Sequence, residues 1–494
     1  MITRGKGLTP SEQKLAALAD RTFLRLWSYP NTFNDRTKSA SGGGQEVADL
    51  LAVFEKHVVL FSDKDIAWQA DKPLSLAWCR WYRRAVEGAI TQLVGASRWL
   101  DLHPDRIFTD KQCLQRLPIP LPPKEERIVH LVAVVSGANA ASCHYFSHSC
   151  GTFMIQPGLK GKMHLQTERD HFHPFVIGDP NPDGSLVHVF DPAGLEFVMQ
   201  ELDTVSDFTS YLVERSRFLR SGQLTIAAGE DDLLAAYMMN GFIDGRPGFV
   251  PQKLRVNAWR KRVAIPEGEY ETYISSRLYA EIASLKKQSM LWDKIIEMIS
   301  DDVLKGTSIS ILDVEPSVQL SESALRVMAS EKRMDRVKLA QALGQAMGRS
   351  LDEKLPRLVR RVLISRMRPN LEIGYIFLLL PHDEAAGTYE EYRQYRSSML
   401  STYSLSFFRE QPKLDVAVAI ALDLYRAGAE IRTRSEDVIA MEAPDWTPEL
   451  LANLEANRAL FELKHPRDLE SLAIRQKVRN PFRLKSQRGG RNRF

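Results

Sequence analysis

Two adjacent apolar segments near the N-terminus, Val47–Phe54 and His57–Lys64, constrain the fold more than any other feature of the sequence. Both are dense in valine, leucine and phenylalanine, and the gap of two or three residues between them is typical of a β-hairpin. Each segment nevertheless contains a charged residue, Asp49 in the first and Lys64 in the second. A charge inside an apolar strand is costly unless it is paired or has a function, so these two residues need an explanation.

The length of the hairpin turn decides which charged side chains face each other. Side chains alternate along a strand, so a two-residue turn at Lys56-His57 would place Asp49 opposite Lys64. A turn one residue longer would place Asp49 opposite Asp63 as a pair of carboxylates. The sequence leaves both registers open.

Helical patterns flank the hairpin on both sides. Thr9 and Glu12 form a capping box, Pro10 suits the first helical position, and the pattern predicts a helix to about Trp27. A second helix is predicted over residues 73–100, where apolar residues recur at helical spacing. The order over this part of the chain is therefore helix, hairpin, helix.

This order resembles the core of the PD-(D/E)XK nuclease superfamily, in which a strand bearing Asp is followed by a strand that ends in x-x-Lys. The resemblance covers about residues 9–100 and implies a restriction-endonuclease-like sheet flanked by helices. It also implies that Asp49 binds a metal ion and that Lys64 aids catalysis. The position that matches the second acid of the family is Ser62.

The missing second acid has three candidates in the sequence. Glu46, Asp63 across a bulge, or Glu12 from the first helix could supply it, with Asp49, Glu46 and Asp63 as the expected metal ligands. Gln92 resembles a glutamine that follows the lysine in some branches of the family, although the tyrosine expected four positions later is Ala96. The alternative is that Asp49 and Lys64 form an ordinary ion pair and that Glu12 only completes its capping box.

Phosphodiester cleavage explains why these residue types would occur together. Mg²⁺ or Mn²⁺ held by one or two carboxylates polarises a phosphoryl oxygen, and a nearby lysine can hold the attacking water. We therefore expect a metal-dependent nuclease that acts on nucleic acid, with DNA as the favoured substrate, in restriction, repair or anti-phage defence. The alternative is a nuclease fold without activity that serves as a scaffold for nucleic acid or protein, which Ser62 favours.

The whole chain of 494 residues is predicted to be an α+β protein. Residues 1–220 would form the nuclease-like domain, with its sheet extended by a strand at 128–136 and a hairpin at 175–190. Residues 221–465 would form a mainly α-helical accessory domain that could bind a protein partner, with strands expected near 375–380, 416–422 and 437–441. Residues 466–494 would form a basic tail, since 471–494 contains eight Lys or Arg and no acidic residue, and such a tail favours a polyanion.

Cysteine content and hydropathy indicate the compartment. The four cysteines form no C-x-x-C pair, which favours a reducing, cytoplasmic location over a disulfide framework. The apolar runs are much shorter than the ~20 residues of a membrane helix, so we expect no membrane partner. The sequence does not indicate the oligomeric state.

Two further patterns have competing interpretations. One is a group of seven possible zinc ligands whose spacing matches no standard zinc motif, so that loop and core residues are the favoured interpretation. These are Cys143, His144, His148, Cys150, His164, His171 and His173. The other is the segment 78–84, in which aromatic residues alternate with arginines, as they do on surfaces that bind phosphates, although core packing beside a solvated basic face fits equally well.

Overall fold

The structure is a computed structural model that describes residues 2, 4–36, 42–147, 152–240, 247–249, 262–305, 318–367, 370–383, 387–463 and 470–474. The chain divides into two compact units. The first comprises Met1–Ala280 with Leu304–Gly306, and the second comprises Glu281–Val303 with Thr307–Phe494. The division therefore lies near residue 280 and not at the predicted residue 220. Most of the predicted basic tail, 466–494, lies outside the described residues.

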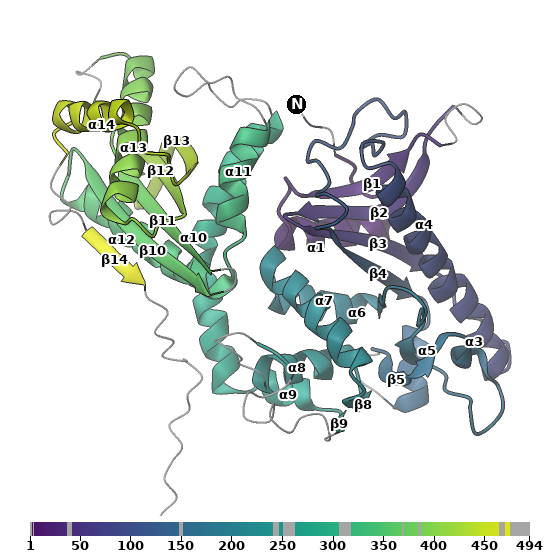
Figure 1. The fold of residues 1–494 in the computed structure, drawn as a ribbon. Helices are drawn as coiled ribbons and strands as arrows, with labels where there is room; N and C mark the ends of the chain where they lie inside the picture. Colours follow the sequence, from purple (N-terminus) through teal and green to yellow (C-terminus); the bar gives the residue numbers. More distant parts are fainter. Residues whose placement is uncertain are drawn as a thin grey trace, which may run out of the picture. The chain divides into compact units, whose positions relative to one another are not determined.

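A five-stranded sheet forms the centre of the first unit (Figure 1). Its strands follow the order β1-β2-β3-β4-β7; β1, β2 and β3 are antiparallel, whereas β3, β4 and β7 are parallel. The strands are β1 (Ser28–Asn34), β2 (Gln45–Phe54), β3 (His57–Asp65), β4 (Ile128–Ser136) and β7 (Val187–Phe190). The predicted hairpin is thus present as β2 and β3, and the strand predicted at 128–136 extends the same sheet as β4.

Helices flank this sheet where the sequence predicts them. The first helix, α1 (Pro10–Thr22), begins where the Thr9 hydroxyl accepts the Glu12 N–H at 3.2 Å. The long helix predicted after the hairpin contains α3 (Leu74–Tyr82), a π-helical turn (Arg83–Glu87) and α4 (Gly88–Leu102). The mixed α/β class is therefore confirmed for this unit.

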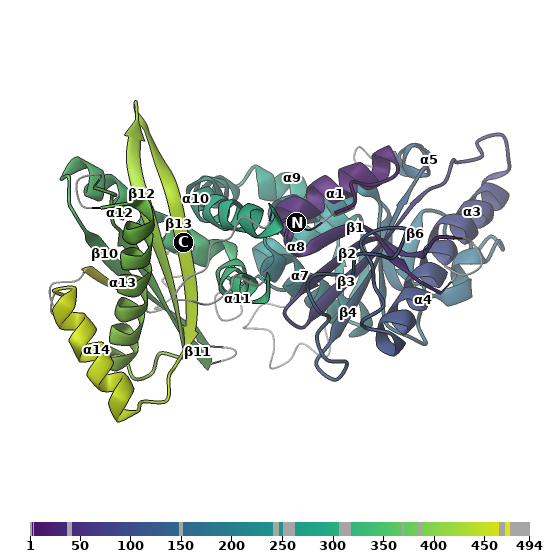
Figure 2. The same ribbon diagram turned by 90° about the horizontal axis from the view of Figure 1, so that it is seen from above.

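Opposite faces of the sheet are covered by different helices. Phe61 of β3 contacts Phe23 at the end of α1 and Phe208 of α7 (Val205–Arg220), with ring centroids 6.1 and 6.4 Å apart. The next residue, Ser62, donates its hydroxyl to Gln92 of α4 instead. Because consecutive strand residues point to opposite sides, α1 and α7 cover one face and α4 covers the other (Figure 2).

A second sheet, with the order β6-β5-β8-β9, completes the first unit. Its strands are β5 (Met154–Lys160), β6 (Val176–Asp179), β8 (Leu224–Ala227) and β9 (Val263–Ile265), and the remaining α-helices are α5 (Asn139–Phe146), α6 (Pro192–Glu201), α8 (Glu230–Asn240) and α9 (Glu269–Ile274). The predicted hairpin at 175–190 is wrong, because β6 pairs with β5 here and β7 pairs with β4 in the first sheet. Two strands joined by a turn have the same sequence pattern whether they pair or enter different sheets.

The second unit is also built around a five-stranded sheet, ordered β13-β12-β11-β10-β14. The strands are β10 (Leu358–Met367), β11 (Asn370–Leu379), β12 (Val416–Ala427), β13 (Glu430–Glu442) and β14 (Glu470–Ile474), and the helices are α10 (Arg277–Lys305), α11 (Val318–Ala329), α12 (Arg333–Asp352), α13 (Tyr389–Glu410) and α14 (Pro448–Leu460). The strands predicted near 375–380, 416–422 and 437–441 are present in β11, β12 and β13, whereas β10 and β14 were not predicted. Charged residues along β10, such as Arg360 and Arg361, hide the apolar pattern of that strand.

Phe61→Ala tests the packing between β3, α1 and α7. We expect it to lower the free energy of unfolding by about 3–5 kcal/mol, because Phe61 is fully buried and its removal leaves a cavity against Phe23 and Phe208. Urea unfolding followed by tryptophan fluorescence measures the effect. Leu8→Ala is the control, since Leu8 is 72% exposed and should change the value by no more than about 0.5 kcal/mol. Equal effects of the two substitutions would contradict this packing.

Candidate functional site

The candidate site lies where β2 and β3 separate. Their ladder runs from Phe54 and His57 to Leu50 and Phe61. Beyond that point β2 still pairs with β1 as far as Gln45, while β3 still pairs with β4. Both strands therefore keep their outer partners while a gap opens between them.

The register differs from both predicted registers. The two turn residues are Glu55 and Lys56, and Glu55 adopts a positive φ of 50°. Such two-residue turns usually place glycine, asparagine or aspartate at positive φ, and for this reason the sequence did not indicate the turn. Continuing the ladder by one step places Asp49 level with Ser62, and neither Lys64 nor Asp63 is its direct opposite.

The Asp49 carboxylate nevertheless reaches three of the other candidate residues. One oxygen accepts the backbone N–H of Asp63 at 2.5 Å and lies 3.7 Å from the Lys64 amine. The other oxygen accepts the Gln92 side-chain amide at 3.3 Å. The Asp49 side chain is 5% exposed and that of Lys64 26%, so the carboxylate is covered while the amine reaches solvent.

Ser62 takes part in this arrangement although it is not an acid. Its hydroxyl is fully buried and donates to the Gln92 amide oxygen at 2.8 Å. This bond turns the amide nitrogen of Gln92 toward Asp49, where it donates. Ser62 thus orients Gln92, and through it the Asp49 carboxylate.

Asp63 points to the face of the sheet covered by α1. One of its carboxylate oxygens accepts the Ser11 hydroxyl. The other, Oδ1, is buried and has no hydrogen-bond partner among the described residues. Burial raises the pKa of the Asp63 carboxyl, and the nearby charges of Asp49 and Glu12 add to the increase.

Glu12 and Glu46 are brought together by Asn31 of β1. The Asn31 amide donates to Glu12 at 2.8 Å and to Glu46 at 3.0 Å. Glu12 also accepts the Leu8 N–H at 2.7 Å, so of the predicted capping box only the bond from the Glu12 N–H to the Thr9 hydroxyl is formed. Burial is the largest cause of a raised Glu46 pKa, and the charges of Asp49 and Glu12 act in the same direction.

The pKa of Asp49 is raised as well. Burial is the main cause, and Lys64, the Asp63 N–H and Gln92 partly oppose it. Hydrogen bonds, the Asp49–Lys64 ion pair and electrostatic effects on pKa values therefore link the six candidate residues into one group at the gap between β2 and β3. Sequence reasoning missed Asn31 and Ser11, which connect this group, because neither belongs to the motif.

The carboxylates are suited to a metal ion in type but form no complete cage. Across the described ranges, no three or more His, Cys, Asp or Glu side chains are grouped so that they could hold a metal ion by themselves. Mg²⁺ usually takes only one or two carboxylates and completes its shell with water and substrate phosphate. The unpartnered Asp63 Oδ1, close to a carboxylate that receives an Asp63 hydrogen bond, fits that kind of site.

The described members of the His/Cys group do not form a metal site. His164 is buried, its Nδ1 lies 2.7 Å from the Gly161 carbonyl oxygen, and its Nε2 accepts the Gly178 N–H at 3.0 Å. Both ring nitrogens are therefore used, and burial lowers the His164 pKa to about 4. His148 and Cys150 lie outside the described residues.

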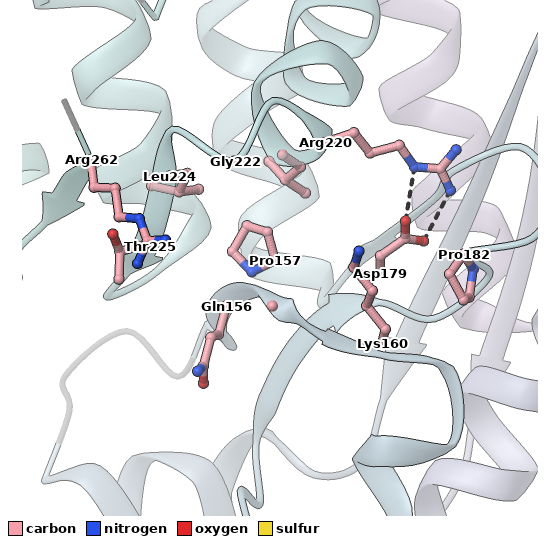
Figure 3. Close-up of a pocket in the computed structure, with 12 residues that line it drawn as sticks. Gln156, Pro157, Lys160, Asp179, Pro182, Arg220, Gly222, Leu224, Thr225 and Arg262 are labelled. Carbon is pink, nitrogen blue, oxygen red and sulfur yellow. Dashed lines mark hydrogen bonds and ion pairs between the residues drawn. The ribbon is translucent and has the colours of Figure 1, made fainter. Parts of the chain in front are cut away.

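A cavity of about 480 Å³ between β5, β8 and the end of α7 is separate from this group (Figure 3). Arg220 lines it and forms two bonds to the buried Asp179, at 2.8 and 3.1 Å. None of the six candidate residues, all of them within the described chain, lines this cavity. The cavity therefore adds no residue to the candidate site.

Comparisons with known proteins give no independent indication of a family. No protein-family model, curated protein or solved structure matches this chain. In the part of the chain that the structure describes, no helix combines the length and apolar character needed to cross a membrane.

Glu46→Gln tests the electrostatic cost of the group. A carboxyl with a raised folded-state pKa reduces stability above that pKa and has no such effect below its ordinary value of 4.5. In EDTA, the variant should therefore be more stable than the wild type at about pH 8, and the difference should vanish as the pH falls below 4.5. Thermal unfolding across this range measures it. Glu125→Gln, at an exposed position, is the control, and a pH-independent difference would contradict the expectation.

Proposed function

We propose that this protein is a Mg²⁺- or Mn²⁺-dependent nuclease that cleaves DNA at the gap between β2 and β3. The supporting observation is that the Asp49 carboxylate lies 3.7 Å from the Lys64 amine and accepts the backbone N–H of Asp63, whose own Oδ1 is buried and has no partner among the described residues. A structural ion pair does not need further buried carboxyls beside it, since each one adds a desolvation cost. A site that binds a cation and a phosphate does need them.

Each candidate residue has a distinct role in this proposal. Asp49 and Asp63 would hold the metal ion, with Glu46 as a third carboxylate. When bound, the ion would polarise the phosphoryl oxygen and lower the pKa of a water. Lys64, whose amine reaches solvent, would hold that water or offset the negative charge that develops on the phosphate.

The remaining residues would position these groups. Gln92 fixes one oxygen of Asp49 through the 3.3 Å bond, and Ser62 fixes Gln92. Glu12 would act through Asn31, which binds Glu12 and Glu46 together. The proposed setting is the cytoplasm, in restriction, repair or anti-phage defence, with a protein partner for the second unit.

Ser62 favours a second candidate function. Where the family carries an acid, this chain has a buried hydroxyl that is already bonded to Gln92. A nuclease fold that lost one metal ligand in this way could serve as a scaffold for nucleic acid or protein. The two functions differ in whether DNA is cut in the presence of metal.

Plasmid cleavage with Mg²⁺ or Mn²⁺ separates the two functions. Asp49→Ala and Lys64→Ala should each lower the cleavage rate by at least ~100-fold, because each removes a group that would act on the metal or the phosphate. Asp71→Ala and Lys72→Ala are matched controls, since these residues form an exposed ion pair of the same type, at 2.8 Å. Both controls should retain activity.

Two outcomes would contradict a nuclease site at Asp49 and Lys64. Cleavage that persists in Asp49→Ala would place the activity elsewhere. DNA binding by the wild type with no cleavage under either metal would support the scaffold. Circular dichroism of each variant shows that the loss of activity does not come from unfolding.

Metal binding can be measured without substrate. Mn²⁺ should raise the melting temperature of the wild type, because an ion that binds only the folded state stabilises it, by about 2.7 kcal/mol at a hundred times its Kd. The increase should disappear in Asp49→Ala and shrink in Asp63→Ala, and it should remain in Asp71→Ala. An equal increase in all four proteins would show that the ion binds elsewhere.

A further inference from the structure

The helix that supplies Gln92 contains a π-helical turn before it. α3 and α4 form one continuous helix beside the sheet (Figure 1), joined through Arg83–Glu87. Within this turn the Gly88 N–H points to the Arg83 carbonyl, five residues earlier. A π turn accommodates one more residue than an α turn, and such turns are frequent at functional sites.

The extra residue brings Arg84 onto the Gln92 side of the helix. In an uninterrupted α-helix, two residues eight positions apart differ by about 80° around the axis. Because the π turn contains one extra residue, Arg84 and Gln92 are instead separated by about two full turns, or roughly 11 Å along the axis, and lie on the same side. Arg80 lies about one turn further along the same side. Arg80, Arg84 and Gln92 therefore form a row that leads to Asp49.

A hollow of about 350 Å³ lies beside this row. It is lined by Ile66 and Ala67, which follow directly after β3, and by residues of the helix including Arg80, Arg83 and Arg84. Lys64 lies two residues before Ile66. The hollow therefore begins two residues along the chain from Lys64, the residue proposed to act on the phosphate.

Hydrogen bonds to one carbonyl group fix the backbone and the helix on the two sides of the hollow. The Ser136 carbonyl at the end of β4 accepts the Trp81 indole N–H at 3.0 Å and the Ile66 N–H at 3.4 Å. Gly137 follows with φ +97°, and a side chain there would collide with the Ile66 carbonyl, whose oxygen lies 1.9 Å from the Cβ position. The helix and the end of β3 are therefore tied to the same backbone.

The charge of the hollow is positive. Arg80, Arg83 and Arg84 are exposed, and no carboxylate is among the described residues that line it. The Arg84 side chain has no ion pair or hydrogen bond with the described part of the chain, while the Arg80 side chain bonds there only to the neutral Gln69. The aromatic residues between these arginines, Trp81 and Tyr82, are buried and serve core packing. Phosphate contact is left to the arginines.

We propose that Arg80 and Arg84 bind the phosphate backbone of the nucleic-acid strand whose scissile phosphate lies at Asp49 and Lys64; this rests on the proposed nuclease function. One strand of a duplex has a phosphate every 3.4 Å or so along the axis, so the roughly 11 Å between Arg84 and Gln92 spans about three nucleotides. Arginine suits this role because its guanidinium matches the geometry of a phosphate.

Binding without cleavage tests this inference apart from the nuclease activity. Fluorescence anisotropy in EDTA, with the Asp49→Ala protein and labelled duplex DNA or an RNA of the same sequence, gives the affinity over a range of salt concentrations. The change Arg80→Ala/Arg84→Ala should weaken binding by roughly 10-fold or more and reduce the slope of log K against log salt by about 1.8, because two phosphate contacts are lost. Comparing DNA with RNA shows which backbone is preferred.

Arg98→Ala is the matched control. Arg98 is an exposed arginine of the same helix, and counting around the axis places it on the side away from Arg84. It should change the affinity by less than about twofold and leave the slope unchanged. Equal loss in the control and the double variant, or an unchanged slope in the double variant, would overturn the inference. If the double variant shows the expected loss of affinity and slope but the wild type never cuts DNA, the nuclease proposal is refuted and the proposed binding site for the phosphate backbone still stands.

Discussion

The candidate site depends on the early end of the β2–β3 ladder. Both strands stay bonded to their outer neighbours, β1 and β4, so the sheet remains intact while a gap opens at its centre. A backbone N–H exposed by such a gap needs an acceptor, and the Asp49 carboxylate provides one for Asp63 at 2.5 Å. This bond holds the carboxylate in the gap, next to Lys64 on one face and near Asp63 on the other. The remaining candidate residues are arranged around it.

The electrostatics of the gap are unfavourable for stability alone. Burial raises the pKa values of Glu46, Asp49 and Asp63, and the charge of Glu12 raises all three further. Among the described residues the Asp49 carboxylate has one ion-pair partner, the Lys64 amine, at 3.7 Å. Perturbed carboxyls of this kind cluster at functional sites, where stability is given up for chemistry. A divalent cation would relieve the repulsion, and for this reason we prefer a metal site to a structural ion pair.

The sequence predicts the helices and strands of the first unit better than their register and their tertiary contacts. The apolar runs of β2, β3 and β4 and the capping of α1 are local signals, and these elements form where they are expected. The hairpin register depends on Glu55 at positive φ, which no local preference indicates. Asn31 and Ser11 enter the site because β1 and α1 pack beside it, which is a tertiary effect. In the second unit the apolar runs of β11, β12 and part of β13 predict strands, whereas the charged residues of β10 conceal that strand, since burial of its apolar neighbours becomes apparent only in the folded chain.

The most direct test of the central claim is the position of a bound metal ion in a crystal soaked with Mn²⁺. Anomalous diffraction should show a peak in the gap between β2 and β3, within inner-sphere distance, about 2.0–2.2 Å, of an Asp49 oxygen. An oxygen of Asp63 or Glu46 should be the second protein ligand of the ion. A gap that stays free of Mn²⁺, with Asp49 still bonded to Lys64, Gln92 and the Asp63 N–H, would contradict a metal-dependent site at this position.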